Sequence, residues 1–396
     1  MTAPNAPRST ASFAGATRPS AAHASLVNVK EVAQPMSDGS TPFRGARIGA
    51  LTEGSDVRKA STRVEDTRAG RAAPAPDDAP LTITLDDLLA ARDRIAPYIH
   101  RTPLLSSKML GGMSGTELWL KAENLQRTGS FKIRGALNSV LQLTPEQRAR
   151  GIIAFSAGNH GQGVAQAAAL VGARCVIFAP ETAPALKVAA MRGYGAEVRF
   201  APSMAEIEAR MDAYRVEHGL HYVHPFGDHA TIAGQGTLGL ELFEDQPELD
   251  VIVTGVGGGG LLAGIAVAAK ALRPATRVIG VEPEGAPTVY AALRAGGPVP
   301  LPRIATLADG LAAARTAPLT YQVIRRLVDD VVLVTEEQIR EALILVLQRT
   351  KLVCEPAGVA GVAAILAQSA GIAPGARVAA VLSGGNIDLT TLKRLL

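Results

Sequence analysis

The sequence has few cysteines, no long apolar run and little net charge, and each of these absences excludes a class of protein. Only Cys175 and Cys354 occur in 396 residues, both in apolar surroundings, so neither a disulfide framework nor a cysteine metal cluster is expected. Every apolar stretch is broken by glycine, proline or charge before it reaches the roughly 20 residues that span a bilayer. The formal net charge is +4, and no dense run of lysine and arginine with interleaved aromatics occurs, so nucleic-acid binding has little support. The sequence therefore predicts a cytoplasmic protein with two reduced thiols and neither a membrane nor a nucleic-acid partner.

The first 80 residues differ in composition from the rest of the chain. They are rich in alanine, serine, threonine, proline, glycine and arginine and show no sustained apolar periodicity, which predicts a disordered N-terminal tail over residues 1–80. The first acidic residue is Glu31, a feature shared with organellar transit peptides, and a start codon assigned too early is a further explanation. The same compositional bias runs through the whole chain, so a targeting segment is the least favoured of the three.

From Leu81 onward, short runs rich in valine and isoleucine alternate with longer segments rich in alanine and leucine. Continuous apolar strands separated by helices are typical of parallel sheets covered by helices on both faces, which predicts an α/β fold. The expected strands are Ile152–Ser156, Cys175–Ala179, Glu197–Ala201, Asp250–Thr254, Arg277–Val281 and Arg377–Ser383. The expected helices include His160–Val171, Met204–Glu217, Leu261–Leu272, Glu336–Leu347 and Ala360–Gln368.

Three glycine-containing loops follow predicted strands, at the edge where open α/β sheets bind ligands. The first, Ser156–Gly163, reads SAGNHGQG and leads straight into a helix, whose first backbone amides can hold an anion such as a substrate carboxylate. Asn159 adds a side-chain donor and acceptor. A strand-to-helix turn capped by asparagine would have the same pattern, so this loop alone does not decide between the two interpretations.

The second loop carries four consecutive glycines, Gly257–Gly260, before Leu261. A row of N–H groups without side chains suits a phosphate, helped by the positive end of the following helix. No Lys-Ser/Thr follows, so this is not a Walker loop, and the glycine spacing fits a dinucleotide site poorly. Because glycine costs backbone entropy, four in a row favour a functional explanation over a structural one.

Lys132 supplies a reactive group that the glycine loops lack. It lies in the first turn of a predicted helix, directly after Thr128–Phe131. The helix dipole disfavours a cation at this position and so favours the neutral amine that a Schiff base requires. Without the other loops, a solvated surface lysine would be the preferred interpretation. The third loop, Ser383–Asp388, would likewise be taken for a simple turn.

Together these segments resemble the threonine/serine ammonia-lyase (dehydratase) family of fold-type II pyridoxal-phosphate enzymes. The resemblance covers Leu81 to the C-terminus, and it implies a two-domain fold similar to the tryptophan synthase β subunit, with pyridoxal 5′-phosphate as cofactor. It rests on the order and spacing of five motifs: Lys121–Lys132 (KAENLQRTGSFK), Ser156–Gly163, Gly257–Leu261, Glu355–Gly358 (EPAG) and Ser383–Asn386 (SGGN).

The resemblance implies a role for each of the residues in these motifs. Lys132 would hold the cofactor as a Schiff base and take the substrate α-proton, with Phe131 packing near the cofactor. Asn159 would contact the pyridine 3-hydroxyl, Ser383 would bond the pyridine nitrogen, and Glu355 would support them from outside the site. The remaining predicted site residues are Gly257, Gly258, Gly259, Gly260 and Leu261 for the cofactor phosphate, and Ser156, Ala157 and His160 for the substrate carboxylate.

The implied activity is conversion of L-threonine to 2-oxobutanoate and ammonia, with L-serine as a second substrate. Ile133 follows the lysine where threonine and cysteine synthases of this fold usually carry aspartate. Ala157 occupies the position of the second serine that serine racemases use as acid and base, so efficient racemisation is not expected. Racemases also bind a divalent cation through a glutamate and a downstream aspartate; here Glu282 is present but Thr288 replaces the aspartate, so no metal site is expected.

Three alternatives remain open from the sequence: a threo-3-hydroxyaspartate ammonia-lyase, a serine racemase/dehydratase, and a non-catalytic protein that binds pyridoxal phosphate and acts by interaction. The expected large domain comprises residues 81–153 and 232–396, and the expected small domain comprises residues 154–231. No C-terminal regulatory domain is expected, since the chain ends soon after the Ser383 loop. A homodimer or homotetramer is expected, and 2-oxobutanoate fits both isoleucine biosynthesis and threonine breakdown.

Overall fold

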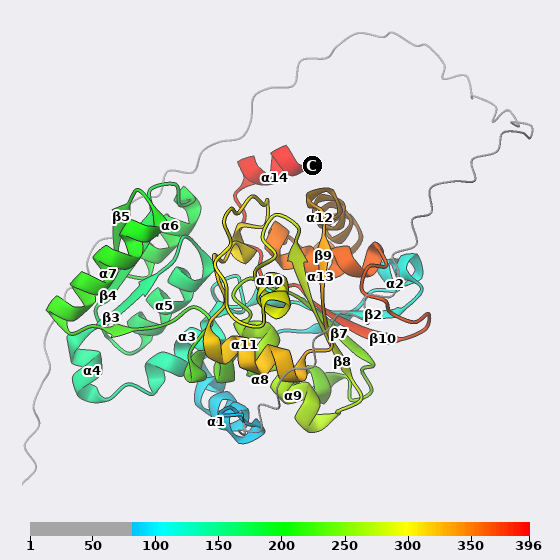
Figure 1. Cartoon of the computed structure of the whole chain (residues 1–396), viewed down its shortest axis with the longest axis horizontal. Helices are drawn as coiled ribbons and strands as arrows, with labels where there is room; N and C mark the ends of the chain where they lie inside the picture. Colours follow the sequence, from blue (N-terminus) through cyan, green and yellow to red (C-terminus); the bar gives the residue numbers. More distant parts are fainter. Residues whose placement is uncertain (1–80) are drawn as a thin grey trace, which may run out of the picture. The chain divides into compact units, whose positions relative to one another are not determined.

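Two sheets organise the chain in the computed structural model, which describes residues 81–396; the predicted tail, residues 1–80, lies outside the described residues (Figure 1). The six-stranded sheet runs, edge to edge, through β1 (Leu104–Ser106), β2 (Glu117–Lys121), β10 (Arg377–Val381), β7 (Val251–Gly255), β8 (Arg277–Pro283) and β9 (Asp330–Val334). The four-stranded sheet runs through β5 (Glu197–Ala201), β4 (Cys175–Pro180), β3 (Ile152–Phe155) and β6 (His221–Tyr222). Neighbouring strands are parallel except β1 and β2, which are antiparallel.

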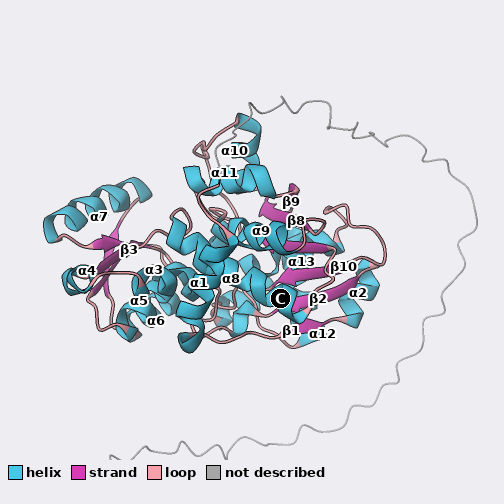
Figure 2. Cartoon of the chain, turned by 90° about the horizontal axis from the view of Figure 1, so that it is seen from below, coloured by secondary structure: helices cyan, strands magenta, loops and turns pink. Residues whose placement is uncertain are grey.

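Helices separate the strands along the chain, as the alternating sequence pattern predicts. Around the smaller sheet lie α4 (Pro145–Arg150), α5 (Asn159–Leu170), α6 (Ala185–Gly193) and α7 (Met204–His218). The other helices are α1 (Leu85–Ile95), α2 (Lys108–Ser114), α3 (Lys132–Leu141), α8 (His229–Asp245), α9 (Gly260–Leu272), α10 (Thr288–Ala295), α11 (Pro318–Leu327), α12 (Glu336–Thr350), α13 (Pro356–Leu366) and α14 (Leu389–Leu395). Short 3₁₀ turns occur at Ala96–Tyr98 (η2), Glu123–Leu125 (η3) and Asp309–Leu311 (η4). Figure 2, with strands in magenta, shows β3 among α4, α5 and α7, away from β8, β9 and β10.

The larger sheet buries apolar side chains on both faces, because successive residues of a strand point to opposite sides. On β7, Ile252 joins the cluster formed with α8 and α9, whereas Val251 and Val253 join the cluster formed with α12 and α13. On β10, Ala379 and Ala380 divide between the same two clusters. The two-sided burial explains why these strands are continuous apolar runs without polar alternation.

The predicted strands and helices occur in the structure, with changes at their ends. The segment 197–201 is a strand with the predicted bounds, and 204–217 extends by one residue as α7. The prediction for 360–368 was wrong at its start, because α13 begins four residues earlier, at Pro356. Proline disfavours helix interiors but suits the first helical position, where its missing N–H costs nothing. The strand ending at Ser383 was also too long, since β10 ends at Val381.

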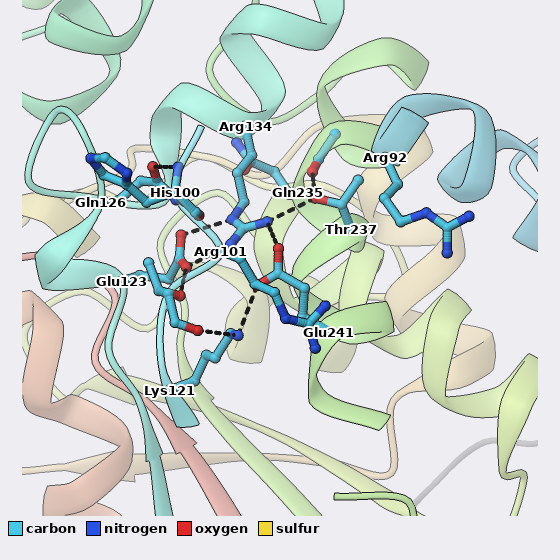
Figure 3. A network of polar contacts seen from close by, with 12 residues as sticks. Arg92, His100, Arg101, Lys121, Glu123, Gln126, Arg134, Gln235, Thr237 and Glu241 are labelled. Carbon is cyan, nitrogen blue, oxygen red and sulfur yellow. Dashed lines mark hydrogen bonds and ion pairs between the residues drawn. The ribbon is translucent and has the colours of Figure 1, made fainter. Parts of the chain in front are cut away.

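A cluster of buried charges fixes α3 between β2 and α8 (Figure 3). The guanidinium of Arg134 donates to both oxygens of Glu123 at 2.8 Å and to both oxygens of Glu241 at 2.7 and 2.9 Å. Lys121 also contacts Glu241, at 2.7 Å, and donates to the carbonyl of Thr102 at 2.7 Å. The two cations thus balance the two carboxylates. Burial alone would raise the pKa of Glu241, but Arg134 and Lys121 hold it below its ordinary value.

Replacing Arg134 with methionine tests this cluster. Arg134→Met leaves two buried carboxylates with Lys121 as their remaining cation, and breaking a buried pair in this way costs about 3–5 kcal/mol. We expect the free energy of unfolding, measured by urea denaturation of the cofactor-free protein, to fall by that amount. Arg210→Met is the control, because Arg210 pairs with Glu206 on the surface of α7, and its loss changes stability by no more than about 0.5 kcal/mol. Equal losses in the two variants would contradict the interpretation.

Candidate active site

Lys132 is the first residue of α3, as predicted, and a neighbouring loop holds it in place. Ser130 forms a bridge with Gly384, and the amide of Phe131 donates to the carbonyl of Ser383 at 3.1 Å. The lysine and Ser383 loops are therefore joined by backbone contacts, although about 250 residues separate them in the chain.

The side chain of Lys132 is half-buried, and its Nζ donates to the carbonyl of Pro225 at 2.9 Å. Burial lowers the pKa of Lys132 to about 8, because the ammonium form loses hydration. Nζ also lies 5.2 Å from the ring centre of Phe131. The amine is therefore much more available in its neutral form than an ordinary lysine is.

The glycine loop presents a row of unpartnered amides at the start of α9. Within residues 81–396, no hydrogen bond engages the N–H groups of Gly257–Leu261, although four of these five residues are buried. Buried amides almost always have a partner, so this row is built for a bound anion. Gly259 has a φ of +97°, which a residue with a side chain rarely adopts.

Phe226 packs directly over this loop. A methyl group added at Gly258 would overlap the ring of Phe226, and one added at Gly260 would lie 2.8 Å from the carbonyl oxygen of Phe226. The hydroxyl of Thr316 donates to the carbonyl of Gly258 at 2.9 Å, which holds the loop from the other side. Phe226 follows Pro225, so one short segment connects the lysine to the glycine loop.

A second row of unpartnered amides opens α5. Among residues 81–396, no hydrogen bond engages the N–H groups of Ala157, Asn159 and His160. The hydroxyl of Ser156 accepts from the amide of Gly158 at 3.0 Å, which shapes the turn. The start of α5 therefore also suits an anion, at the carboxyl end of β3.

The side chain of His160 is buried, as are those of Ser156 and Gln162 in the same loop. Its Nε2 lies 2.9 Å from the carbonyl oxygen of Val223, so Nε2 carries the proton and Nδ1 is left without a partner in the described chain. Burial, with a smaller effect from Lys132, lowers the pKa of His160 to about 3, so the ring is neutral. The backbone amide of His160, rather than its ring, is available to an anion.

The side chain of Asn159 is hydrogen-bonded to a neighbouring loop, whereas the hydroxyl of Ser383 has almost no partner. The amide nitrogen of Asn386 donates to the carbonyl of Thr128 at 2.8 Å and to the side-chain oxygen of Asn159 at 2.9 Å. The hydroxyl of Ser383 makes one long contact, 3.4 Å, with the carbonyl of Ala357. The Ser383 hydroxyl is therefore free to bond a ligand atom.

Two charged residues that the sequence analysis missed, Lys187 and Asp309, complete the site. Nδ2 of Asn159 donates to one carboxylate oxygen of Glu355, and Lys187 donates to the other at 3.1 Å. Lys187 also donates to Asp309 at 2.8 Å. No motif marks Lys187. The one available signal is its place on the apolar face of α6, beside Val188 and Met191, all three buried.

Glu282 lies near the end of β8, and Thr288 is the first residue of α10. Both carboxylate oxygens of Glu282 accept backbone amides at 2.8 Å, from Val289 and Tyr290, and the hydroxyl of Thr288 donates to the carbonyl of Ala313 at 2.6 Å. Within residues 81–396 no group of three or more histidine, cysteine, aspartate and glutamate side chains is placed to hold a metal ion. The expectation of no metal site remains a prediction.

Comparison with known proteins places this arrangement in a family. Residues 95–384 match the family model described as "Pyridoxal-phosphate dependent enzyme". An L-threonine ammonia-lyase of Thermotoga maritima is 44% identical over 316 residues, which is 79% of this chain and 78% of that protein. A serine racemase of Dictyostelium discoideum is 40% identical over 80% of this chain and 98% of its own length. The solved structure of a threonine deaminase from T.th. is 45% identical with a TM-score of 0.73, covering 77% of this chain and 99% of that one.

This chain therefore belongs to the threonine ammonia-lyase family of pyridoxal-phosphate-dependent enzymes. The family, the α/β fold class and the cofactor class inferred from the sequence are confirmed. The residues fit the cofactor: a row of orphaned buried amides suits its phosphate, and a largely desolvated lysine suits its aldehyde. Among the helices of residues 81–396, none combines the length and apolarity needed to cross a bilayer.

The lowered pKa predicts how Lys132 reacts in the cofactor-free protein. With a pKa of about 8, about a tenth of the side chain is neutral at pH 7, whereas an ordinary lysine of pKa about 10.4 is almost entirely charged. We expect its acylation rate to rise between pH 7 and 9 and then level off. Peptide mapping by mass spectrometry measures this rate, with exposed Lys108 as the reference. A rate that still rises steeply above pH 10 would contradict the predicted environment.

A methyl group in the glycine loop should weaken phosphate binding. In Gly258→Ala the new group displaces Phe226 from the loop, and overpacking of this kind costs about 1–3 kcal/mol, so we expect the affinity for pyridoxal phosphate to fall about 10-fold or more. Fluorescence titration of the cofactor-free protein measures the dissociation constant. Gly112→Ala on α2 is the matched control, since a methyl there has no neighbour within 4 Å. Unchanged affinity in Gly258→Ala would remove the loop from the cofactor site.

Proposed function

We propose that this protein is an L-threonine ammonia-lyase that forms 2-oxobutanoate and ammonia, and that it also converts L-serine to pyruvate. The observation that carries the proposal is the pairing of two rows of unpartnered amides, at the starts of α9 and α5, with the largely desolvated amine of Lys132. One row suits a phosphate and the other a carboxylate, which are the two anions that this reaction brings together. The identity of 44% to an L-threonine ammonia-lyase supports the substrate class.

In this proposal each predicted site residue has a defined role. Pyridoxal phosphate, when bound, supplies a conjugated ring that accepts the electrons left on the substrate α-carbon. Lys132 would hold it covalently, and the Nζ amine, once the substrate amine has displaced it from that link, would take the α-proton, with Phe131 lining the site beside Nζ. The amides of Gly257–Gly260 and Leu261 bind the phosphate. Asn159 donates to the ring 3-oxygen, and the hydroxyl of Ser383 bonds the ring nitrogen.

The substrate carboxylate binds at the start of α5. Ser156, Ala157 and His160 contribute backbone amides there or shape the turn. The methyl side chain of Ala157 cannot exchange a proton, so one face of the substrate α-carbon lacks the acid that racemisation needs. This favours elimination over the serine racemase alternative, although serine racemases are among the relatives.

Two further features belong to the proposal. The small domain, residues 154–231, carries the Asn159 loop, and the large domain, residues 81–153 and 232–396, carries Lys132, so substrate would bind between them. We also propose a cytoplasmic homodimer or homotetramer. The buried, unpaired thiols of Cys175 and Cys354 support a reducing compartment, and light scattering of the purified protein tests the assembly.

The decisive experiment is a 2-oxo acid assay with the purified protein. L-threonine, L-serine, their D-forms and threo-3-hydroxyaspartate are compared, and 2-oxobutanoate from L-threonine is the expected main product. Chiral analysis of the L-serine reaction should detect pyruvate without D-serine. Absence of any 2-oxo acid would favour a non-catalytic cofactor-binding protein, and preferred turnover of threo-3-hydroxyaspartate would replace threonine as the substrate.

Removing the proposed base separates binding from catalysis. Lys132→Ala should lower turnover of L-threonine by at least about 10³-fold, because a positioned base contributes about 10²–10⁴-fold and the covalent link to the cofactor is also lost. The visible absorbance of the covalently bound cofactor should disappear as well. A variant that keeps both the absorbance and the turnover would place the covalent link on another lysine.

A further inference from the structure

Lys187 connects the helices around the four-stranded sheet to segments beside the six-stranded sheet. It lies on α6, beside the four-stranded sheet, whereas its partners Asp309 and Glu355 lie on η4 and directly before α13, beside the six-stranded sheet. Its ammonium donates to Asp309 at 2.8 Å and to Glu355 at 3.1 Å. The side chain is 5% exposed, so the charge is almost entirely removed from water. A lysine buried in this way requires partners, and both of them come from segments beside the other sheet.

We propose that Lys187 is a positioning residue, whose ammonium between Asp309 and Glu355 holds α6 against the larger sheet and fixes the orientation of the Asn159 side chain. This inference rests on the proposed function, because Asn159 has a cofactor oxygen to contact only in that case. Lys187 touches none of the reacting atoms and acts through Glu355.

The orientation of Asn159 is set from both of its ends. Asn386 uses its amide nitrogen for the Thr128 carbonyl, so it must donate to the side-chain oxygen of Asn159. The side-chain nitrogen of Asn159 then faces Glu355, whose carboxylate accepts it. An ionised carboxylate can only accept, so this direction holds as long as Glu355 keeps its charge.

Lys187 determines whether Glu355 keeps that charge. Burial raises the pKa of Glu355, Asp309 raises it further, and Lys187 opposes both. The charged groups that face the carboxylate are Lys187 and Asp309, and Asn159 is its neutral partner. Without Lys187, Glu355 takes up a proton at higher pH. Protonated Glu355 can donate as well as accept, so it no longer requires the side-chain nitrogen of Asn159 to face it, and the contact with Asn386 alone sets the orientation.

The stem of Lys187 also packs against the Asn159 loop itself. A methyl group added at Gly158 would lie 2.9 Å from Cδ of Lys187 and 3.4 Å from Nζ. Gly384, next to Ser383, packs against Glu355, since a methyl group added at Gly384 would overlap the Glu355 carboxylate. Lys187 and Glu355 thus contact the backbones that carry Asn159 and Ser383, and a change in one is transmitted to both loops.

The test compares Lys187→Met, Lys187→Arg and the control Lys270→Met. Lys270 forms a similar pair with Asp329 at 2.8 Å, remote from the site. Loss of a charge-assisted hydrogen bond is worth about 1.5–3 kcal/mol, so we expect kcat for L-threonine to fall about 10- to 100-fold in Lys187→Met, with a smaller change in KM. Lys187→Arg should recover part of this loss, and Lys270→Met should leave kcat unchanged.

The pH profile distinguishes positioning from a general loss of structure. In Lys187→Met, the acid limb of kcat should move to higher pH, because Glu355 is protonated there. Asp309→Asn removes the neighbouring like charge, so its acid limb should move to lower pH or stay in place. A limb at higher pH in Asp309→Asn, or an unshifted limb with unchanged kcat in Lys187→Met, would overturn the proposal.

Two readouts do not depend on turnover. Hydrogen exchange of the cofactor-free protein should show faster exchange of α6 amides in Lys187→Met but not in Lys270→Met, and the dissociation constant for pyridoxal phosphate should rise in the same variant. If the wild type lacks ammonia-lyase activity but these two effects occur, the proposed function fails and the positioning role stands. If Lys187→Met does not fold, Lys187→Gln, which also removes the cation, supplies the same measurements, and wild-type kcat, acid limb and α6 exchange in that variant would contradict the role.

Discussion

The placement of Lys132 depends on the ion pairs of Arg134, two residues further along α3. Glu123 and Glu241 each accept two hydrogen bonds from the planar guanidinium of Arg134. Glu123 is the first residue of η3, which follows β2, and Glu241 lies on α8, so the contacts fix α3 against two independent elements. A shift of α3 by a fraction of a turn would break several charge-assisted bonds in a buried setting. The reactive amine is therefore held by a cluster that never touches a ligand.

Helix starts supply the rest of the site, and this follows from the parallel sheets. Parallel strands end at one edge of a sheet and are followed by helices. The first amides of α5 and of α9 therefore each lie at the carboxyl edge of their own sheet. These amides have no partner within residues 81–396, which creates positive potential suited to anions. The neutral amine of Lys132 has a different cause, because loss of hydration on burial disfavours the ammonium form.

The sequence was informative where chemistry is local. The strands, the loops that follow them and the place of Lys132 in the first turn of α3 could be predicted, although most strand ends differ by one or two residues, because backbone conformation and apolar pattern are properties of neighbouring residues. The ring of His160 could not be placed, since its bond to the Val223 carbonyl depends on how α5 meets another strand end. Lys187 and Asp309 were missed for a similar reason: 122 residues separate them, and no short motif records a pair that only tertiary packing creates.

The two buried charge clusters differ in a way that suits their positions. The Arg134 cluster has two cations and two buried carboxylates, with the more exposed Asp245 3.5 Å from Lys121, and the side chains of Arg134, Lys121 and Glu123 are fully buried. The Lys187 cluster has one cation for two carboxylates, and the side chain of Asp309 is 49% exposed. Water can replace Asp309 as a partner at little cost, whereas nothing can replace Glu123 or Glu241 around Arg134. The attachment of α6 through Lys187 is consequently weaker than the attachment of α3 through Arg134. In the proposed function substrate binds between these elements, and this distribution of buried charge would allow them to separate at α6 while α3 stays fixed.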